Sequence, residues 1–391
     1  MRFAAKATQT SGWFSIGAAQ RAGFLAVCGL TTLDTIPAQV SEIVVHDFVR
    51  PSGSITYAGV ILSPGAIYGT TQFGGNGAGV VYKVDATGYT VLHSFSGEDG
   101  LQPAGALIRD SAGNLYGTTI LGGTSNAGVV YKLDPAGDET VLYNFQGGTE
   151  ADGAYPQAGV IRDAEGHLYG TTLNGGAVGF GTVFKLDAAG NFSVLYSFTD
   201  RADGGSPMSG VARDSAGNLY GTTPFGGASA RGVVYKLDTA GQETALYSFT
   251  NTDASGVILD SAGNLYGTTG SGGAWGYGTV YKLDPAGQQT VLYSFMGGAD
   301  AGSPGSGVTR DSGGNLYGTA YSGGTNNGLV YKLDAGGNLT VLYSFPGGSG
   351  GFEPYGGVAI GPAGGLWGTT YAGGKYKQGV IYVLPGAAAA Q

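Results

Sequence analysis

Eight acidic side chains stand in stretches of this chain that vary between otherwise repeated units, and a pair of them could act as general acid and base. The same side chains, together with backbone carbonyl groups, could instead bind Ca²⁺. Three of them directly precede glycine, and Asp-Gly is a turn signal in its own right. No D-x-D-x-D run occurs, so turn formation is the favoured interpretation, and neither a catalytic residue nor a metal ligand is predicted. The eight are Glu98, Asp99, Glu150, Asp152, Asp203, Asp253, Asp300 and Glu353.

The three histidines occupy positions that other units fill with structural residues. His46 and His93 replace a Tyr, and His167 replaces an Asn in a turn. Single substitutions of this kind predict neither a histidine metal cluster nor a nucleophile–base pair. The chain also lacks a P-loop, a G-x-S-x-G motif and a dinucleotide-binding fingerprint, so no cofactor is predicted.

A ten-residue string, DSAGNLYGTT, defines the elements that must position any site. It occurs at 110–119, 214–223 and 260–269, with near-copies at 163–172 and 311–320. Its Tyr has a counterpart every 46 to 53 residues, which divides the chain into seven units. These counterparts are Tyr68, Tyr116, Tyr169, Tyr220, Tyr266, Tyr317 and Trp367.

Each unit contains four short runs rich in Val, Leu, Ile, Tyr, Phe and Thr, in the third unit 158–163, 167–172, 181–187 and 193–198. Such runs favour strands, and the D-x-x-G links predict tight hairpin turns. Four antiparallel strands in each of seven units predict an all-β, seven-bladed β-propeller. The first run of each unit is expected to lie innermost. The Tyr counterparts are expected between blades, with the following glycine relieving crowding near the axis.

The seventh unit ends after its third run, and its missing fourth run lies at the other end of the chain, at 43–48. We therefore predict that the strand at 42–48 completes the last blade and closes the ring, which removes exposed sheet edges. The domain at 41–391 then has blades at approximately 58–95, 104–145, 158–198, 209–249, 254–295, 305–345 and 356–384 plus 42–48.

Residues 1–40 are expected to be a signal peptide or leader. Arg2, Lys6 and Arg21 precede an apolar run at 22–30 that is too short to span a bilayer. The remainder carries 15 basic and 26 acidic residues. An acidic body repels phosphate backbones, so nucleic acid is not an expected partner. We predict a monomer without a transmembrane span, secreted, extracellular or periplasmic after removal of the leader.

The loops between the second and third runs, and those between units, differ in length and chemistry and should share one face of the disc. Loops that vary on a repeated scaffold can carry specificity, so the ligand site is predicted on this variable face. Its aromatic residues could stack on a carbohydrate or pack against an extracellular protein. The alternative is a lyase or hydrolase that uses carboxylates at the channel mouth on a polysaccharide or small molecule. The candidate ligand-binding residues are Tyr155, Phe180, Trp275, Tyr277, Phe352, Tyr355 and Tyr376.

The unit GNLYGTT-x2-GG, followed by VVYKLD-x2-G-x2-TVLYSF, resembles the GloVer-type tandem repeat. The likeness covers residues 42–384, and the pairing of LYGTT with VYKLD makes it specific. It implies an exported, propeller-like repeat scaffold. It implies no activity, so no catalytic residue is carried over from the family.

Overall fold

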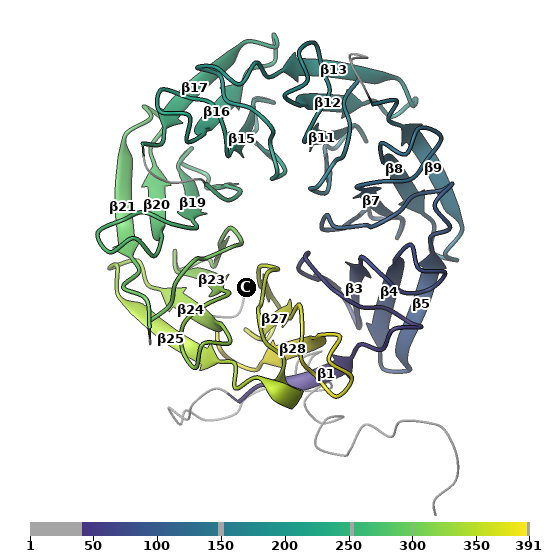
Figure 1. The fold of residues 1–391 in the computed structure, drawn as a ribbon, viewed down its shortest axis with the longest axis vertical. Coiled ribbons are helices and arrows are strands. Elements are labelled where there is room, and N and C mark those ends of the chain that lie inside the picture. Colours follow the sequence, from purple (N-terminus) through teal and green to yellow (C-terminus); the bar gives the residue numbers. More distant parts are fainter. Residues whose placement is uncertain (1–40, 148–151, 251–253, 299, 389–391) are drawn as a thin grey trace, which may run out of the picture.

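The computed structural model describes residues 41–147, 152–250, 254–298 and 300–388, and seven four-stranded antiparallel sheets make up this part of the chain. The sheets stand side by side around a central axis, like the blades of a propeller (Figure 1). This confirms the prediction of an all-β, seven-bladed propeller. The described residues contain one helix, the one-turn 3₁₀ helix η1 (Gly348–Gly350). No helix in this part of the chain is long and apolar enough to cross a membrane.

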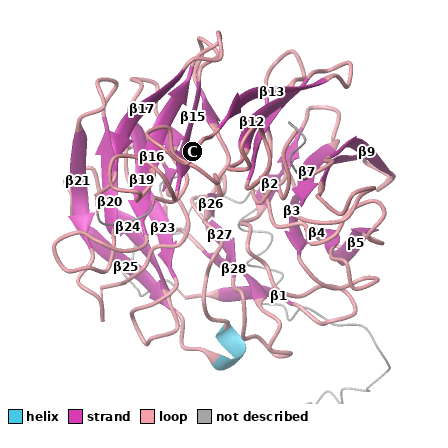
Figure 2. Ribbon diagram, turned by 45° about the horizontal axis from the view of Figure 1, so that its top comes forward, coloured by secondary structure: helices cyan, strands magenta, loops and turns pink. Residues whose placement is uncertain are grey.

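The four strands of a blade lie in a fixed order from the axis outward, and a tilted view shows the sheets stacked around it (Figure 2). The innermost are β2 (Ile61–Ser63), β6 (Ile108–Arg109), β10 (Ile161–Arg162), β14 (Ala212–Arg213), β18 (Ile258–Leu259), β22 (Thr309–Arg310) and β26 (Ala359–Ile360). The second are β3 (Ala66–Thr71), β7 (Leu115–Thr119), β11 (Leu168–Thr172), β15 (Leu219–Thr223), β19 (Leu265–Thr269), β23 (Leu316–Ala320) and β27 (Leu366–Thr369). The third are β4 (Val80–Asp85), β8 (Val129–Leu133), β12 (Thr182–Leu186), β16 (Val233–Leu237), β20 (Thr279–Leu283), β24 (Leu329–Leu333) and β28 (Val380–Leu384). The outermost are β5 (Gly88–Ser94), β9 (Glu139–Asn144), β13 (Phe192–Ser197), β17 (Glu243–Ser248), β21 (Gln289–Ser294), β25 (Leu339–Ser344) and β1 (Ile43–Asp47).

The N-terminal strand completes the seventh blade, as its sequence predicts. β1 pairs antiparallel with β28, from Ile43 opposite Val383 to Asp47 opposite Val380. Phe48 follows β1 and is fully buried in a cluster that joins the seventh blade to the first. The ring is therefore closed by hydrogen bonds between the two ends of the described chain.

The core lies between blades. Each of the seven clusters of buried side chains combines residues from two neighbouring blades, such as Tyr169 of the third with Leu219 of the fourth. The Tyr of LYGTT takes part in this packing, which confirms its predicted place. Because its two neighbours cover the two faces of each blade, the second and third strands are buried along most of their length.

The glycine of LYGTT has a different role from the one expected. Gly267 pairs with Tyr281 across β19 and β20, and a Cβ on Gly267 would lie 2.6 Å from the Tyr281 hydroxyl oxygen. The glycine therefore makes room for an aromatic ring of the third strand, and not for crowding at the axis.

The innermost strands are shorter than their sequence predicts. The run at 158–163 forms a strand only at Ile161–Arg162. Just before it, the backbone of Gly159 approaches that of the second blade so closely that a Cβ would overlap the Ala106 carbonyl oxygen. Near the axis, contacts between blades therefore replace sheet pairing within a blade.

The two threonines of GTT hold neighbouring blades and their own loop together. In the third blade, the Thr171 hydroxyl donates to the Ser209 carbonyl oxygen of the next blade at 2.9 Å. The Thr172 hydroxyl donates to the Asn174 carbonyl oxygen at 2.9 Å, and so fixes the loop that follows β11. Equivalent bonds from the first threonine join Thr118 to Ala158, Thr222 to Ser255, Thr268 to Ser306, Thr319 to Gly356 and Thr369 to Ala58.

Candidate functional site

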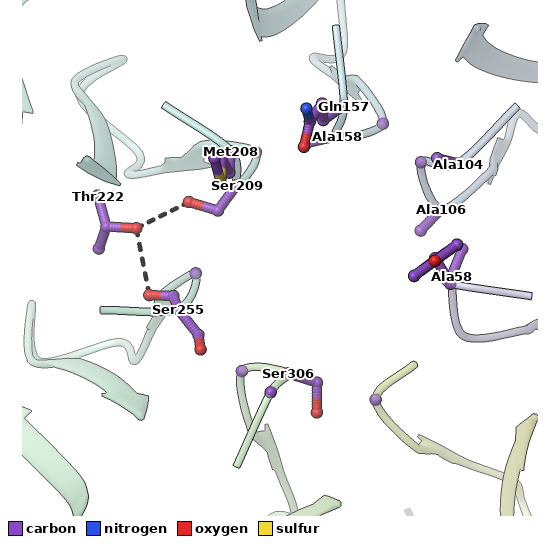
Figure 3. A pocket seen from close by; sticks show the side chains of 18 of the residues that line it. Ala58, Ala104, Ala106, Gln157, Ala158, Met208, Ser209, Thr222, Ser255 and Ser306 are labelled. Carbon is purple, nitrogen blue, oxygen red and sulfur yellow. Dashed lines mark hydrogen bonds between the residues drawn. The ribbon is translucent and has the colours of Figure 1, made fainter. Parts of the chain in front are cut away.

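A cavity of about 590 Å³ lies on the axis of the propeller. Its wall comes from the segments that enter the innermost strands, where each blade contributes small residues (Figure 3). The labelled small residues of the wall are Ala58, Ala104, Ala106, Ala158, Ser209, Ser255 and Ser306. The wall is largely apolar, with hydroxyl groups on one side.

Three polar residues of the wall are joined by hydrogen bonds. The hydroxyl groups of Ser209 and Thr222 lie 2.8 Å apart, and Thr222 donates to the Ser255 carbonyl oxygen at 3.2 Å. Among the described residues that line the cavity there is no carboxyl or imidazole group. The wall can position a ligand by shape and hydrogen bonds.

Four tyrosines gather at one side of the cavity mouth. Tyr57 and Tyr355 both line the cavity, and their ring centroids lie 5.6 Å apart. Tyr371 contacts both rings edge-on at 5.4 Å, and Tyr321 stacks on Tyr355 at 5.5 Å with an interplanar angle of 13°. Tyr57 is 41% exposed and Tyr321 38% exposed. We call these four residues the tyrosine cluster.

Two members of the tyrosine cluster, Tyr57 and Tyr355, have pKa values raised above that of an ordinary phenol. Burial, together with the neighbouring Tyr371 hydroxyl, raises the pKa of Tyr57 to about 12. Burial and the Glu353 carboxylate also raise the pKa of Tyr355. Among the described acidic candidates, Glu353 is the one whose charge contributes to the raised pKa values of Tyr57 and Tyr355. The phenols offer apolar ring faces and hydroxyl donors together.

The loops that carry the tyrosine cluster are held by backbone hydrogen bonds between blades. Glu353 has a φ of 57° and accepts a hydrogen bond from the Tyr371 N–H at 2.9 Å, while its own N–H donates to Asn327 of the preceding blade. Ile55 makes the equivalent pair of bonds, from Gln72 and to Gln378. The cluster is therefore presented by an ordered framework.

The structure brings only one of the seven predicted aromatic residues, Tyr355, into the tyrosine cluster. Phe180, Trp275, Tyr277 and Tyr376 lie in loops between the second and third strands of the third, fifth and seventh blades, and they are 37–63% exposed. Tyr155 packs against the core between the second and third blades, and Phe352 bridges to Ala372. No ring contact joins any two of these seven within the described residues.

Sequence reasoning missed Tyr57, Tyr321 and Tyr371. Tyr57 and Tyr355 precede equivalent small residues at the start of their innermost strands, while Tyr321 and Tyr371 directly follow GTA and GTT. A comparison of the seven repeats position by position could have shown that the first place is aromatic only in the first and seventh blades, and the second place only in the sixth and seventh. The predicted residues were sought in the loops that vary most between units, whereas Tyr321 and Tyr371 directly follow the second strands.

Four of the eight acidic candidates hold turns at the outer rim, as the turn interpretation predicts. Asp203 accepts hydrogen bonds from the Tyr196 hydroxyl at 3.0 Å and from the Thr199 N–H at 2.8 Å, which fixes the chain as it leaves β13. The matching bonds to Asp99, Asp152 and Asp300 come from His93, Tyr143 and Tyr293. Glu98 is exposed, and Glu150 and Asp253 lie outside the described residues. These rim positions do not favour the alternative of a hydrolase or lyase with carboxylates at the channel mouth.

Glu243→Gln is expected to flatten the pH dependence of the free energy of unfolding between about pH 4.5 and 7. Burial, together with the Asp203 charge, raises the pKa of Glu243 to about 7. A carboxyl group whose pKa is higher in the folded state stabilises the fold below its unfolded pKa, and this contribution is lost as the pH rises through the folded pKa. The fifth blade has Gln289 at the matching position, so the variant suits the fold. Urea unfolding at pH 5 and 7.5 measures the effect, and an unchanged slope would contradict the assignment.

The protein is thus a closed seven-bladed propeller whose axial cavity has the tyrosine cluster at its mouth. The chain belongs to the Gloeobacter/Verrucomicrobia repeat family, whose model matches residues 30–215 and 210–389. This confirms the resemblance seen in the repeated motifs. No curated protein matches the sequence.

Several solved structures are similar in fold. One is the extracellular domain assigned to a one-component system of B. thetaiotaomicron, with a TM-score of 0.55, 11% identity, and 88% of this chain and 39% of that chain covered. Puromycin hydrolase has a TM-score of 0.54 at 12% identity, with 82% and 50% covered. A gluconolactonase from Xanthomonas campestris has a TM-score of 0.47 at 14% identity, with 77% and 89% covered. At these identities the likeness concerns the fold alone.

Proposed function

We propose that this protein is a binding propeller that takes a carbohydrate at the tyrosine cluster. The observation that carries the proposal is the contact of four half-exposed tyrosine rings, drawn from three blades, at the mouth of a 590 Å³ cavity. Ligand sites are typically concave and apolar, with a few polar groups that set orientation. Aromatic side chains with a polar tip fit this description, because the ring face packs on apolar surface while the hydroxyl bonds to polar groups.

A pyranose ring suits this site better than a purely apolar ligand. Its C–H face can lie on a phenol ring, and its hydroxyl groups can reach the tyrosine hydroxyls and the carboxylate of Glu353. Gln157, Ser209 and Ser306 supply further polar groups on the cavity wall. The formal charge of −9 disfavours a strongly anionic sugar polymer.

Export of the protein is part of this proposal. Basic residues followed by an apolar run, as in residues 1–40, are typical of a secretory signal. A secreted or periplasmic propeller would meet oligosaccharides outside the cytoplasm. The similar propeller from B. thetaiotaomicron is itself an extracellular domain.

Tyr57→Ala is expected to weaken binding of the recognised oligosaccharide at least tenfold, which corresponds to ~1.4 kcal/mol. An aromatic contact supplies free energy of this size, and Tyr57 is exposed enough for the variant to fold. A glycan array identifies the ligand, and calorimetry of the wild type, Tyr57→Ala and Tyr321→Ala measures the affinities. The matched control is Trp275→Ala, which removes an exposed ring from a loop of the fifth blade and should leave the affinity unchanged.

Two results would overturn the assignment. If Trp275→Ala abolishes binding while Tyr57→Ala does not, the site lies on the loop tips, where an extracellular protein is the better partner. If the folded wild type binds nothing on the array, the carbohydrate proposal is wrong.

A further inference from the structure

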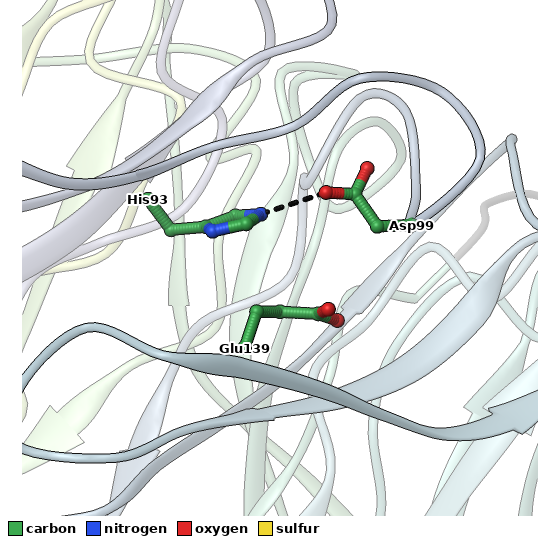
Figure 4. Close-up of side chains that lie close together, drawn as sticks. All are labelled: His93, Asp99 and Glu139. Atoms are coloured by element: carbon green, nitrogen blue, oxygen red, sulfur yellow. Dashed lines mark hydrogen bonds and ion pairs between the residues drawn. The ribbon is translucent and has the colours of Figure 1, made fainter.

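An imidazole and two carboxyl groups meet at the outer rim between the first and second blades. His93 lies near the end of β5, Asp99 in the loop after it, and Glu139 at the start of β9 (Figure 4). The His93 Nε2 and Asp99 Oδ2 atoms are 3.0 Å apart, and one potential ligand atom from each of the three residues lies within 4.8 Å of the others.

The equivalent places between other blades hold different pairs. His46 stacks on Tyr89 with centroids 4.0 Å apart, and Tyr143 stacks on Phe192 at 3.9 Å. Elsewhere the Tyr343 hydroxyl donates to Glu42 at 2.9 Å. Every one of these pairs joins the outer strands of neighbouring blades by ring packing or a hydrogen bond.

The third and fourth blades provide the nearest comparison. There Asp203 and Glu243 match Asp99 and Glu139, but Tyr196 stands in place of His93. The two carboxyl groups are thus a recurring combination, and His93 adds a nitrogen ligand to them in one interface of the described chain.

The geometry of the three side chains suits a cation. The Ser96 N–H and hydroxyl both donate to Asp99 Oδ1, at 2.7 and 3.0 Å, which fixes the carboxylate with Oδ2 toward His93. Glu139 Oε1 is buried and has no hydrogen-bond partner among the described residues. A buried, unpaired carboxylate oxygen beside a second carboxylate is costly unless a proton or a bound cation neutralises one of the two charges.

We propose that His93, Asp99 and Glu139 form a binding site for Zn²⁺. An imidazole nitrogen and two carboxylate oxygens are typical Zn²⁺ ligands, and a water molecule can complete a tetrahedral set. Ligand atoms that share a tetrahedral Zn²⁺ at about 2.1 Å lie about 3.4 Å apart, so only small side-chain movements are needed. Ca²⁺ and Mg²⁺ prefer oxygen ligands throughout and fit the nitrogen of His93 less well.

A bound ion here links β5 and its following loop to β9. It takes the place of the ring stacking and hydrogen bonding that join the outer strands elsewhere. The site is therefore a structural clamp between two blades, distant from the axial cavity and independent of the ligand proposed there.

A second group, Asp163, Glu165 and His167, is a less suitable site. The carboxylate of Asp163 already accepts hydrogen bonds from the His167 N–H, the His167 ring and the Tyr169 hydroxyl. Glu165 is exposed at the tip of the turn. These residues repeat the Asp–Asn–Tyr arrangement of other blades, in which Asp110 bonds to Asn114 and Tyr116.

The test is Zn²⁺ binding to the full chain by calorimetry at pH 7.5, with His93→Tyr as the decisive variant. We expect one Zn²⁺ per chain in the wild type and at least about a 100-fold loss of affinity in His93→Tyr, since even a lost outer-sphere partner costs about 10–100-fold. Tyr is the natural residue at this position in five other blades, so the variant should keep the fold. Glu139→Gln, which copies Gln289, should also weaken binding.

Co²⁺ provides a second readout, because visible absorption bands of the bound ion report its ligands. These bands should appear in the wild type and be absent in His93→Tyr. The matched control is His167→Asn, which removes a different histidine, restores the common turn residue and should bind Zn²⁺ like the wild type. The proposal is overturned if the folded wild type binds no stoichiometric Zn²⁺, if His93→Tyr binds as tightly as the wild type, or if His167→Asn removes the site.

Discussion

Deletion of residues 42–48 is expected to lower the melting temperature by about 10 °C or more and to make the protein prone to aggregation. The deletion removes β1 and the fully buried Phe48, which packs 5.4 Å from Tyr82 of the first blade. Loss of a buried Phe side chain alone costs about 3–5 kcal/mol. It also exposes β28, whose five residues are all buried in the intact ring, as an unpaired edge.

Differential scanning calorimetry and light scattering of the deletion variant measure both effects. Phe48→Ala provides a graded comparison, because it keeps the β1–β28 hydrogen bonds and removes only the ring. Its melting temperature should fall between those of the wild type and the deletion variant. An unchanged melting temperature after the deletion would show that β1 does not hold the ring closed.

Gly267→Val is expected to reduce the free energy of unfolding by about 3 kcal/mol or more. Overpacking of a well-filled core typically costs about 1–3 kcal/mol, and here the new side chain meets an aromatic residue on a paired strand. The Cβ alone would lie 2.6 Å from the Tyr281 hydroxyl oxygen and 2.7 Å from Cζ of the same ring. Tyr281 is itself fully buried and has little room to move.

Gly270→Ala is the matched control for this variant. Gly270 lies three residues further along the same blade, and a Cβ there meets no atom within 4 Å. Other blades carry larger residues at the matching position, such as Ile120 and Leu173. Urea unfolding should therefore show near wild-type stability for Gly270→Ala and a large loss for Gly267→Val. Equal stabilities of the two variants would contradict the role given to the LYGTT glycine.

The fold could be predicted from the sequence because every repeat contains the same turn residues and strand-forming runs in the same order. Turn residues at fixed offsets separate four strand-forming runs, and the spacing of the Tyr counterparts counts the blades. The displaced fourth run at 43–48 also indicated how the ring closes. The length of the innermost strands was overestimated, because β-propensity does not report that glycines such as Gly159 bring two blades into backbone contact.

The candidate sites were harder to predict because their residues come from different blades. Tyr57 and Tyr371 lie more than 300 positions apart and meet only after the ring closes. His93 and Glu139 come from adjacent repeats, and nothing in either repeat alone shows that their outer strands bring the two side chains together. Local patterns predict elements well, whereas contacts between repeats require the radial arrangement.

The way the ring closes also determines the order in which the blades can form during synthesis. Asp47 accepts a hydrogen bond from the Lys375 N–H, although the two residues are 328 positions apart. β1 leaves the ribosome before the first six blades, and its partner β28 leaves after them. The seventh blade therefore cannot form during synthesis of the first six, and closure of the ring pairs β1 with β28 in one long-range step. If the protein is exported as proposed, passage through the membrane in an extended state would suit this order, because the ring could then close with both strands on the same side.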